Sequence, residues 1–425
     1  MAPLEPWEKV LVDVKFLKSE HAKQDCIECH GSVQSPEKDA AHAGLIANPD
    51  QGEGSVCTEC HAEQAATFAT SLHATQQGYW TVLDERSVPE NHPALETIFG
   101  NHCASCHTTC SDCHISQPES VGGGRFSCHL FEKTPPMTRS CTACHGSRVG
   151  NEFLGKNEGF PGDVHFREAR MSCVKCHSGA DMHGVTPEGV DPQTIDHRYS
   201  GPQSPTCESC HPQVVDVQAA QESGNEMHAV HSQNLSCQVC HSITYTSCDG
   251  CHVAVSETSG NPFFETEATY PTFLIGVNSR QSEERPHSYM PVRHVPISPD
   301  SFAFYGEDLL PNFNSLPTWA YATPHNIQLS TPQNQSCESC HANPDLFLTA
   351  DKVNPDELEA NQTVIVQQLP PDLTVAGKPQ PADHVGRAVC VVCHETGVAE
   401  ATIIPEDHAG RSDAACSYCH LAPQP

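Results

Sequence analysis

The sequence predicts a fold that is mostly irregular coil, with short α-helices and few strands, and three features of its composition predict it. The 425 residues include 27 glycines and 34 prolines, and these residues interrupt helices and strands. Hydrophobic residues make up only 37% of the chain, so its side chains alone would form a poor core. The chain also carries 25 cysteines. We therefore expect something other than side chains to fill the interior.

The chain is strongly acidic. It has 53 aspartates and glutamates against 22 lysines and arginines, which gives a formal charge of -31. This balance argues against nucleic acid and anionic lipid as partners, because proteins bind both through basic patches. It suits cationic partners, although an acidic surface can equally be a solvated surface that binds no partner. No segment approaches the length of apolar sequence that crosses a bilayer, so the sequence predicts no membrane span.

One pattern, C-x-x-C-H, occurs twelve times and uses 24 of the 25 cysteines. The paired cysteines are Cys26 and Cys29, Cys57 and Cys60, Cys103 and Cys106, Cys110 and Cys113, Cys141 and Cys144, Cys173 and Cys176, Cys207 and Cys210, Cys237 and Cys240, Cys248 and Cys251, Cys337 and Cys340, Cys390 and Cys393, and Cys416 and Cys419. The histidines that follow them are His30, His61, His107, His114, His145, His177, His211, His241, His252, His341, His394 and His420.

This spacing has a chemical reason. Two thiols three positions apart can each form a thioether with one vinyl group of a haem, and the next residue then places its imidazole on the iron. Zinc ribbons and disulfide scaffolds also use paired cysteines, but neither requires a histidine after every second cysteine. The pattern is the attachment motif of c-type haem. The sequence therefore predicts a coil wrapped around a chain of twelve covalent haem c groups, which form its core.

Sixteen histidines lie outside the motifs, and twelve would suffice to give every haem iron a second imidazole. The chain has only six methionines, so methionine can serve as the second ligand of a minority at most. Our preferred second ligands are His21, His42, His73, His129, His165, His183, His197, His228, His294, His325, His384 and His408. The reserves are His92, His102, His231 and His287. The sequence does not say which histidine serves which haem.

The remaining cysteine, Cys128, precedes His129, and Arg125 stands where the first cysteine of a further motif would be. One interpretation is a decayed thirteenth haem site. The simpler one, which we favour, makes His129 a second ligand and Cys128 an incidental buried thiol.

The spacing of the motifs divides the chain into four predicted segments. Residues 1–100 hold two haems, residues 101–252 hold seven, residues 253–336 hold none, and residues 337–425 hold three. The third and fourth motifs, like the eighth and ninth, are so close in sequence that we expect each pair of haems to be in near contact. The segment without motifs reads as an irregular, wrapping lobe that supplies distal histidines.

Local patterns predict a few regular elements. Residues 63–74 and 212–221 are expected to form short helices, and His73 and His228 are expected to lie on helices. The apolar run 363–369 reads as a strand that pairs with residues 373–377.

The motifs and spare histidines resemble those of the large multihaem c-type cytochromes of bacteria and archaea that respire metals or exchange electrons with partners. The segments 285–296, 322–328 and 150–166 are similar to parts of large multihaem cytochromes distantly related to octahaem reductases. This resemblance implies a chain of haems whose edges lie close enough together for fast electron tunnelling. Some cytochromes of this type polymerise into extracellular filaments, so copies of the same chain are candidate partners beside other redox proteins.

We thus expect long-range electron transfer in anaerobic, extracellular respiration, without substrate chemistry of the protein's own. The expected location is extracellular or at the cell surface, with the periplasm as the alternative and an export signal already removed. A multihaem reductase of a small nitrogen or sulfur oxyanion is the second hypothesis. It needs an open iron, which relatives often mark with C-x-x-C-K, and that motif is absent. A periplasmic electron shuttle is the third hypothesis.

Overall fold

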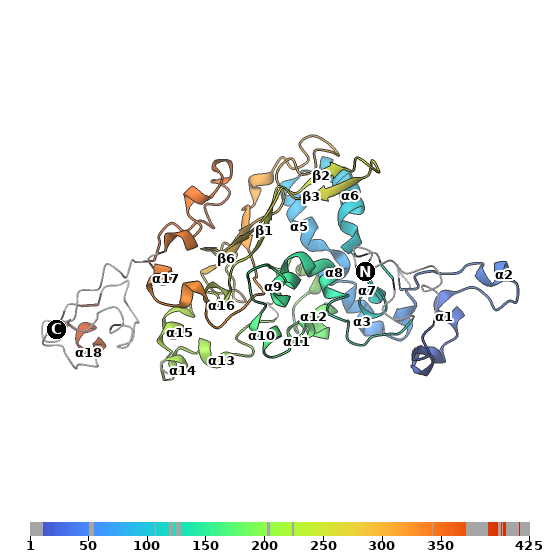
Figure 1. Ribbon diagram of the computed structural model, residues 1–425, viewed down its shortest axis with the longest axis horizontal. Coiled ribbons are helices and arrows are strands. Elements are labelled where there is room, and N and C mark those ends of the chain that lie inside the picture. The colour runs from blue at the N-terminus through green and yellow to red at the C-terminus, as the bar shows by residue number, and fades with distance from the viewer. Residues whose placement is uncertain are drawn as a thin grey trace. The chain divides into compact units, whose positions relative to one another are not determined.

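The structure is a computed structural model, and it describes residues 12–50, 55–106, 108–118, 121, 123–124, 129–201, 205–222, 225–341, 343–370, 390–397, 401, 403–404 and 416 (Figure 1). The chain divides into two compact units that do not follow chain order. The first unit comprises Met1–Ser204, Cys248–Tyr270 and Pro296–Leu316. The second unit comprises Pro205–Ser247, Pro271–Val295 and Pro317–Pro425. The predicted division into four segments by haem content stays a prediction.

The first unit is built mainly from short helices joined by coil. They are α1 (Cys26–His30), α2 (Lys38–His42), α3 (Ala62–Phe68), α4 (Leu72–Thr75), α5 (Gln77–Arg86), α6 (His92–Ile98), α7 (Cys110–His114), α8 (Cys141–His145), α9 (Asn151–Leu154), α10 (Val164–Arg167), α11 (Cys173–Cys176) and α12 (Gly179–Met182). Strands β2 (His252–Val255) and β3 (Pro262–Glu265) form an antiparallel pair in this unit. The predicted helix at residues 63–74 is confirmed as α3 and α4, with His73 on α4.

Hydrophobic burial in the first unit is confined to part of the chain. Among its described residues, no hydrophobic side chain before Leu95 is buried, although this stretch carries the first two motifs. Leu95 and Ile98 on α6 are buried, as is Phe313. Arg86, at the end of α5, is also buried, and its guanidinium lies over the Phe313 ring and donates to the Phe313 carbonyl oxygen. The N-terminal part therefore has too little apolar packing of its own to stabilise a fold.

The second unit combines short helices with a small sheet. Its helices are α13 (Pro212–Val215), α14 (Val217–Glu222), α15 (Glu226–His231), α16 (Cys237–His241), α17 (Glu338–His341) and α18 (Val391–His394). Strands β5 (Leu274–Val277), β6 (Tyr289–His294) and β7 (Trp319–Tyr321) form an antiparallel sheet in that order. A further pair joins β1 (Tyr245–Asp249) and β4 (Ala268–Thr272), and each of these two strands has residues assigned to both units. The predicted helix at 212–221 is confirmed as α13 and α14, and His228 lies on α15 as expected.

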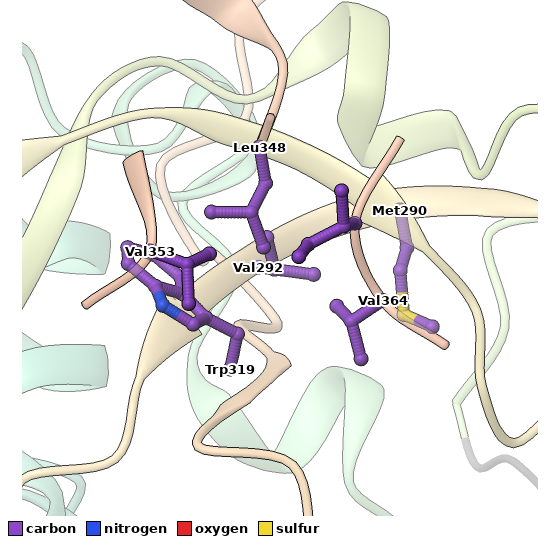
Figure 2. Close-up of a cluster of buried hydrophobic side chains, with 7 residues drawn as sticks. Met290, Val292, Trp319, Leu348, Val353 and Val364 are labelled. Atoms are coloured by element: carbon purple, nitrogen blue, oxygen red, sulfur yellow. The ribbon is translucent and has the colours of Figure 1, made fainter. Parts of the chain in front are cut away.

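A conventional hydrophobic core packs on this sheet. It consists of Met290, Val292, Trp319, Leu348, Val353, Val364 and Ile365 (Figure 2). The segment 253–336 contains strands β3 to β7, so it is not irregular throughout, and its role as a wrapping segment stays a prediction. The prediction of a strand at residues 363–369 is wrong. Residues 363 and 364 lie in a turn, the residues after them form bend and coil, and their apolar run fills the core. The predicted partner of that strand, residues 373–377, lies outside the described residues.

The fold class is thus confirmed in its coarse form, since the described chain consists of short helices, few small strands and much coil. Within the described residues, no helix is both long enough and apolar enough to span a lipid bilayer.

Candidate haem-ligand site

Most of the described motifs are themselves short helices. In α1, α7, α8 and α16 the helix covers the five residues from the first cysteine to the histidine. Positions i, i+3 and i+4 lie on one face of a helix, so both sulfurs and the imidazole point to the same side. A motif in this conformation can present two thioether sulfurs and one nitrogen ligand to a single haem.

The ninth motif has a different conformation. Cys248 lies in β1 and His252 begins β2, with Gly250 between them at φ 66°. Glycine suits this position because a side chain disfavours positive φ. The predicted ligands His107, His384, His408 and His420, together with Cys419 and Cys128, lie outside the described residues.

In the described part of the chain, six motif histidines each face a histidine from outside the motifs. The pairs, with their ring-centre separations, are His30 and His129 at 6.0 Å, His61 and His21 at 6.2 Å, His114 and His183 at 6.1 Å, His145 and His73 at 6.3 Å, His241 and His228 at 5.8 Å, and His341 and His231 at 6.1 Å.

These separations match the geometry of an ion held between two imidazoles. A metal–imidazole bond is about 2 Å long, and the ring centre lies roughly 1 Å beyond the nitrogen, so two such rings on opposite sides have centres about 6 Å apart. Ordinary aromatic pairs cover a wider range, about 4.5 to 7 Å. Ordinary contacts would not pair a motif histidine with a non-motif histidine in all six cases. The residues present therefore fit an iron porphyrin bound between the rings.

The motif histidines are also oriented by hydrogen bonds from their second nitrogen. Nδ1 of His30 donates to the Ile46 carbonyl oxygen at 2.8 Å, and Nδ1 of His114 donates to that of Glu132 at 2.7 Å. Nδ1 of His241 donates to the Gln328 carbonyl oxygen at 3.1 Å. A histidine that ligates a metal commonly uses its other ring nitrogen in this way, which fixes the tautomer and leaves Nε2 unprotonated for the metal.

Burial keeps several of the facing imidazoles neutral. Desolvation lowers the pKa of His73, and the neighbouring His145 lowers it further. The same two kinds of cause, burial first and a nearby histidine second, lower the pKa of His21, His145, His183 and His228. Only the neutral imidazole has a lone pair for a metal, so these surroundings favour the ligating form.

The preferred second ligands divide into three groups. Five of them face a motif histidine, namely His21, His73, His129, His183 and His228. Five others have different contacts. Nδ1 of His42 and Nδ1 of His325 donate to the backbone carbonyl oxygens of Lys38 and Thr323, and Nδ1 of His165 bonds to the Asp163 carboxylate. The His197 ring packs on Tyr199, and Nε2 of His294 bonds to Glu357. The remaining two, His384 and His408, are outside the described residues.

His294 forms a hydrogen bond through one of its two ring nitrogens. Its Nε2 lies 3.0 Å from a Glu357 carboxylate oxygen, which also accepts a hydrogen bond from Thr318. Its ring stands edge-on to Trp319 at 5.6 Å. The role of His294 as a second ligand stays a prediction.

The structure also reveals a ligand candidate that sequence reasoning ranked too low. His231, a reserve, faces His341. It lies three positions after His228 on α15, so one helix presents two histidines on the same side. That i, i+3 spacing was visible in the sequence and could have raised its rank. Among the other reserves, His92 lies 3.5 Å from Asp84 and His102 bonds to the Tyr305 hydroxyl.

No disulfide joins the cysteines of the described residues, and several cysteines from different motifs touch. A hydrogen bond with Cys110 lowers the pKa of Cys57 to about 6, and one with Cys173 lowers the pKa of Cys141 to about 7. Burial raises the pKa of Cys103 to about 11. Once haem attachment turns these sulfurs into thioethers they no longer titrate, but the contacts still show which motifs lie side by side.

Comparison with known proteins gives one informative similarity. No family model matches the chain, and no solved structure matches it. The chain is 22% identical over 257 residues, or 58% of its length, to a high-molecular-weight cytochrome c of Nitratidesulfovibrio vulgaris. The match spans only 35% of the length of that relative. The similarity supports the resemblance to multihaem c-type cytochromes that the motifs and the facing imidazoles indicate.

Proposed function

We propose that this protein transfers electrons over long range through twelve covalent c-type haems, most of them held between two imidazoles, and that it serves extracellular respiration. Its proposed partners are other redox proteins or further copies of the same chain. The observation that supports this most strongly is the set of six ring pairs with centres 5.8 to 6.3 Å apart. Each bound haem would supply an iron that alternates between the ferric and ferrous states.

The chain's own residues would do three things for this function. The paired cysteines would fix each haem edge covalently. The two imidazoles would close both faces of the iron and so exclude other ligands. The hydrogen bonds from Nδ1 of His30 and His114 to backbone carbonyls would hold the imidazole planes in place, so that little rearrangement opposes each electron transfer.

Haem count and spin state test this proposal directly. We expect mass spectrometry of the purified protein to find twelve haems on each chain, and its optical spectrum to be that of low-spin haem. Carbon monoxide added to the reduced, native protein should change the spectrum little, because both faces of most irons carry an imidazole. A count of eight haems or fewer would contradict the proposal.

The planes of the facing rings predict two classes of low-spin haem. The rings are close to parallel in His114 with His183 at 14° and in His228 with His241 at 12°, and they are inclined at 31° in His21 with His61. They are close to perpendicular in the pairs of His30, His145 and His341, at 77°, 85° and 66°.

Parallel imidazoles split the iron d orbitals that carry the unpaired electron, whereas perpendicular ones leave them nearly degenerate. We therefore expect the electron paramagnetic resonance spectrum of the oxidised protein to contain both a rhombic low-spin signal and a strongly anisotropic one. Integration should assign at least three haems to each class. A spectrum with the rhombic class alone would show that the ring planes differ in the loaded protein.

The haem of the ninth motif is the candidate for the open iron that the reductase hypothesis requires. His252 lies opposite Glu265 in the β2–β3 ladder, with Nε2 4.0 Å from the carboxylate, and its Nδ1 bonds to the Gly250 carbonyl. Among the described residues this motif histidine thus faces a carboxylate and not a second imidazole. If carbon monoxide binds one haem of the native protein, and the Glu265→Gln variant alters that binding, the reductase alternative gains support.

A further inference from the structure

The contacts between motifs allow the haems to be ordered, with each haem numbered by its motif from the N-terminus. A cysteine holds a haem by its vinyl-bearing edge. Where cysteines of two motifs touch, the edges bonded to them must therefore lie side by side. This reasoning rests on the proposed function, because it takes every motif to carry a haem.

In the first unit, haem 2 meets haem 4. Cys57 and Cys110 hydrogen-bond with each other, and they belong to the second and fourth motifs. Asp50 lies at the same junction: its carboxylate accepts from the Ser111 backbone N–H at 2.8 Å and acts electrostatically on both thiols. The third motif does not separate these two cysteines, although it lies between them in the sequence.

The series continues to haems 5 and 6. Burial raises the pKa of Cys113 to about 12, and Cys141 and Cys144 are among the neighbours that add to the shift. The Ser140 hydroxyl donates to the Cys113 carbonyl oxygen at 3.3 Å, which joins the fourth and fifth motifs directly. The fifth and sixth motifs are joined by the hydrogen bond between Cys141 and Cys173.

Haem 1 lies at the other end of this series. Burial raises the pKa of Cys29, and Cys57 is the next largest cause, so the first and second motifs are neighbours. A row of aromatic rings also joins their second ligands. Phe131 stacks on the His21 ring at 3.9 Å and 8°, Phe16 lies 6.0 Å from Phe131, and His129 lies 6.1 Å from Phe16.

In the second unit, haem 8 lies between haems 7 and 10. The Cys237 thiol of the eighth motif donates to the carboxylate of Glu208, which lies within the seventh motif, at 3.5 Å, and it also contacts Cys207. Cys240 and Cys340, of the eighth and tenth motifs, pack against the same buried cluster around Val239. Helix α15 reinforces this second contact, because His228 faces the eighth-motif histidine and His231 faces the tenth-motif histidine.

We infer that the haems of each unit form a series whose order departs from the order of attachment: 1, 2, 4, 5, 6 in the first unit and 7, 8, 10 in the second. In this arrangement electrons pass from haem 2 to haem 4 without visiting haem 3. The eighth and ninth motifs, although close in sequence, belong to different units. Four distal histidines cross-link the first series, because His21, His73, His129 and His183 each come from a segment remote from the motif whose histidine they face.

Cryo-electron microscopy of the loaded protein tests this order. In the map, the haem 2 and haem 4 groups should be direct neighbours with no haem between them, and haem 8 should have haems 7 and 10 as neighbours within the second unit. If haem 3 lies between haems 2 and 4, the inferred order is wrong, although twelve bis-imidazole haems would still support the proposed function. A map with few haems would instead contradict that function.

Asp50 provides a second readout that does not depend on a map. A carboxylate beside two ferric haems stabilises both, so the Asp50→Asn variant should raise the reduction potentials of two haems together in an optical redox titration. The amide oxygen can still accept from the Ser111 N–H. The matched control is Asp39→Asn, on the exposed helix α2, and it should leave the reduction potentials of both haems unchanged. If the Asp50→Asn variant raises the reduction potential of only one haem, or of none, the inferred contact between haems 2 and 4 is wrong.

Discussion

Replacing His183 by alanine is expected to convert one of the twelve proposed haems from low spin to high spin. The His183 ring faces that of His114 at 6.1 Å, and its removal takes away one of the two imidazoles proposed for haem 4. Cys110, Cys113 and His114 remain, so the haem stays attached. The optical spectrum should gain a high-spin component, and the reduced variant should bind one carbon monoxide for each chain. Added imidazole should restore the low-spin form.

The matched control is His102→Ala. Nε2 of His102 bonds to the Tyr305 hydroxyl at 2.7 Å, and its ring stands edge-on to Phe264. This variant also removes a histidine beside a haem motif, but it should leave the spin state of every haem unchanged. If both variants gain the same high-spin signal, or if His183→Ala gains none, the pairing of His183 with His114 is wrong.

The second large effect is on stability and concerns the core in Figure 2. The Leu348 side chain is fully buried among Val292, Trp319 and Val364. Truncating a buried leucine to alanine removes apolar contacts and leaves a cavity, which costs about 2 to 5 kcal/mol. We expect Leu348→Ala to lower the free energy of unfolding of the loaded protein by that amount, measured by denaturant titration with far-ultraviolet circular dichroism.

Leu329→Ala is the control for this measurement, because Leu329 is 84% exposed and the substitution is chemically the same. It should change the free energy of unfolding by less than about 0.5 kcal/mol. Equal effects of the two variants would mean that the haems alone determine stability and that the sheet core contributes little.

The sequence predicted the chemistry of the site better than its geometry. The motif cysteines and histidines follow from spacing alone, because five consecutive residues contain everything that attaches one haem. Most of the second ligands do not, because they come from segments far along the chain, and His228, which lies shortly before the motif of His241, is an exception. His129 faces His30, and His183 faces His114, through folding of coil that no local pattern encodes.

Two local patterns were also ambiguous. The run Val364 to Val366 is apolar in the manner of a strand, yet all three residues are buried outside any strand, since a short apolar run fills a core equally well in either form. The sequence also could not show that His294 bonds to Glu357, because Glu357 lies on a distant segment and only the fold brings the two together. The composition predicted a poor hydrophobic core. The described residues before Leu95 agree with that prediction, because none of their hydrophobic side chains is buried, whereas the second unit contains a buried hydrophobic core.

Near-infrared magnetic circular dichroism of the oxidised, purified protein tests the central claim most directly, because its charge-transfer bands distinguish the axial ligands of low-spin haem. The account predicts that bands of bis-imidazole haem correspond to at least six haems on each chain. Bands of histidine–methionine or high-spin haem for most of the irons would contradict it, as would a protein that contains another metal in place of haem.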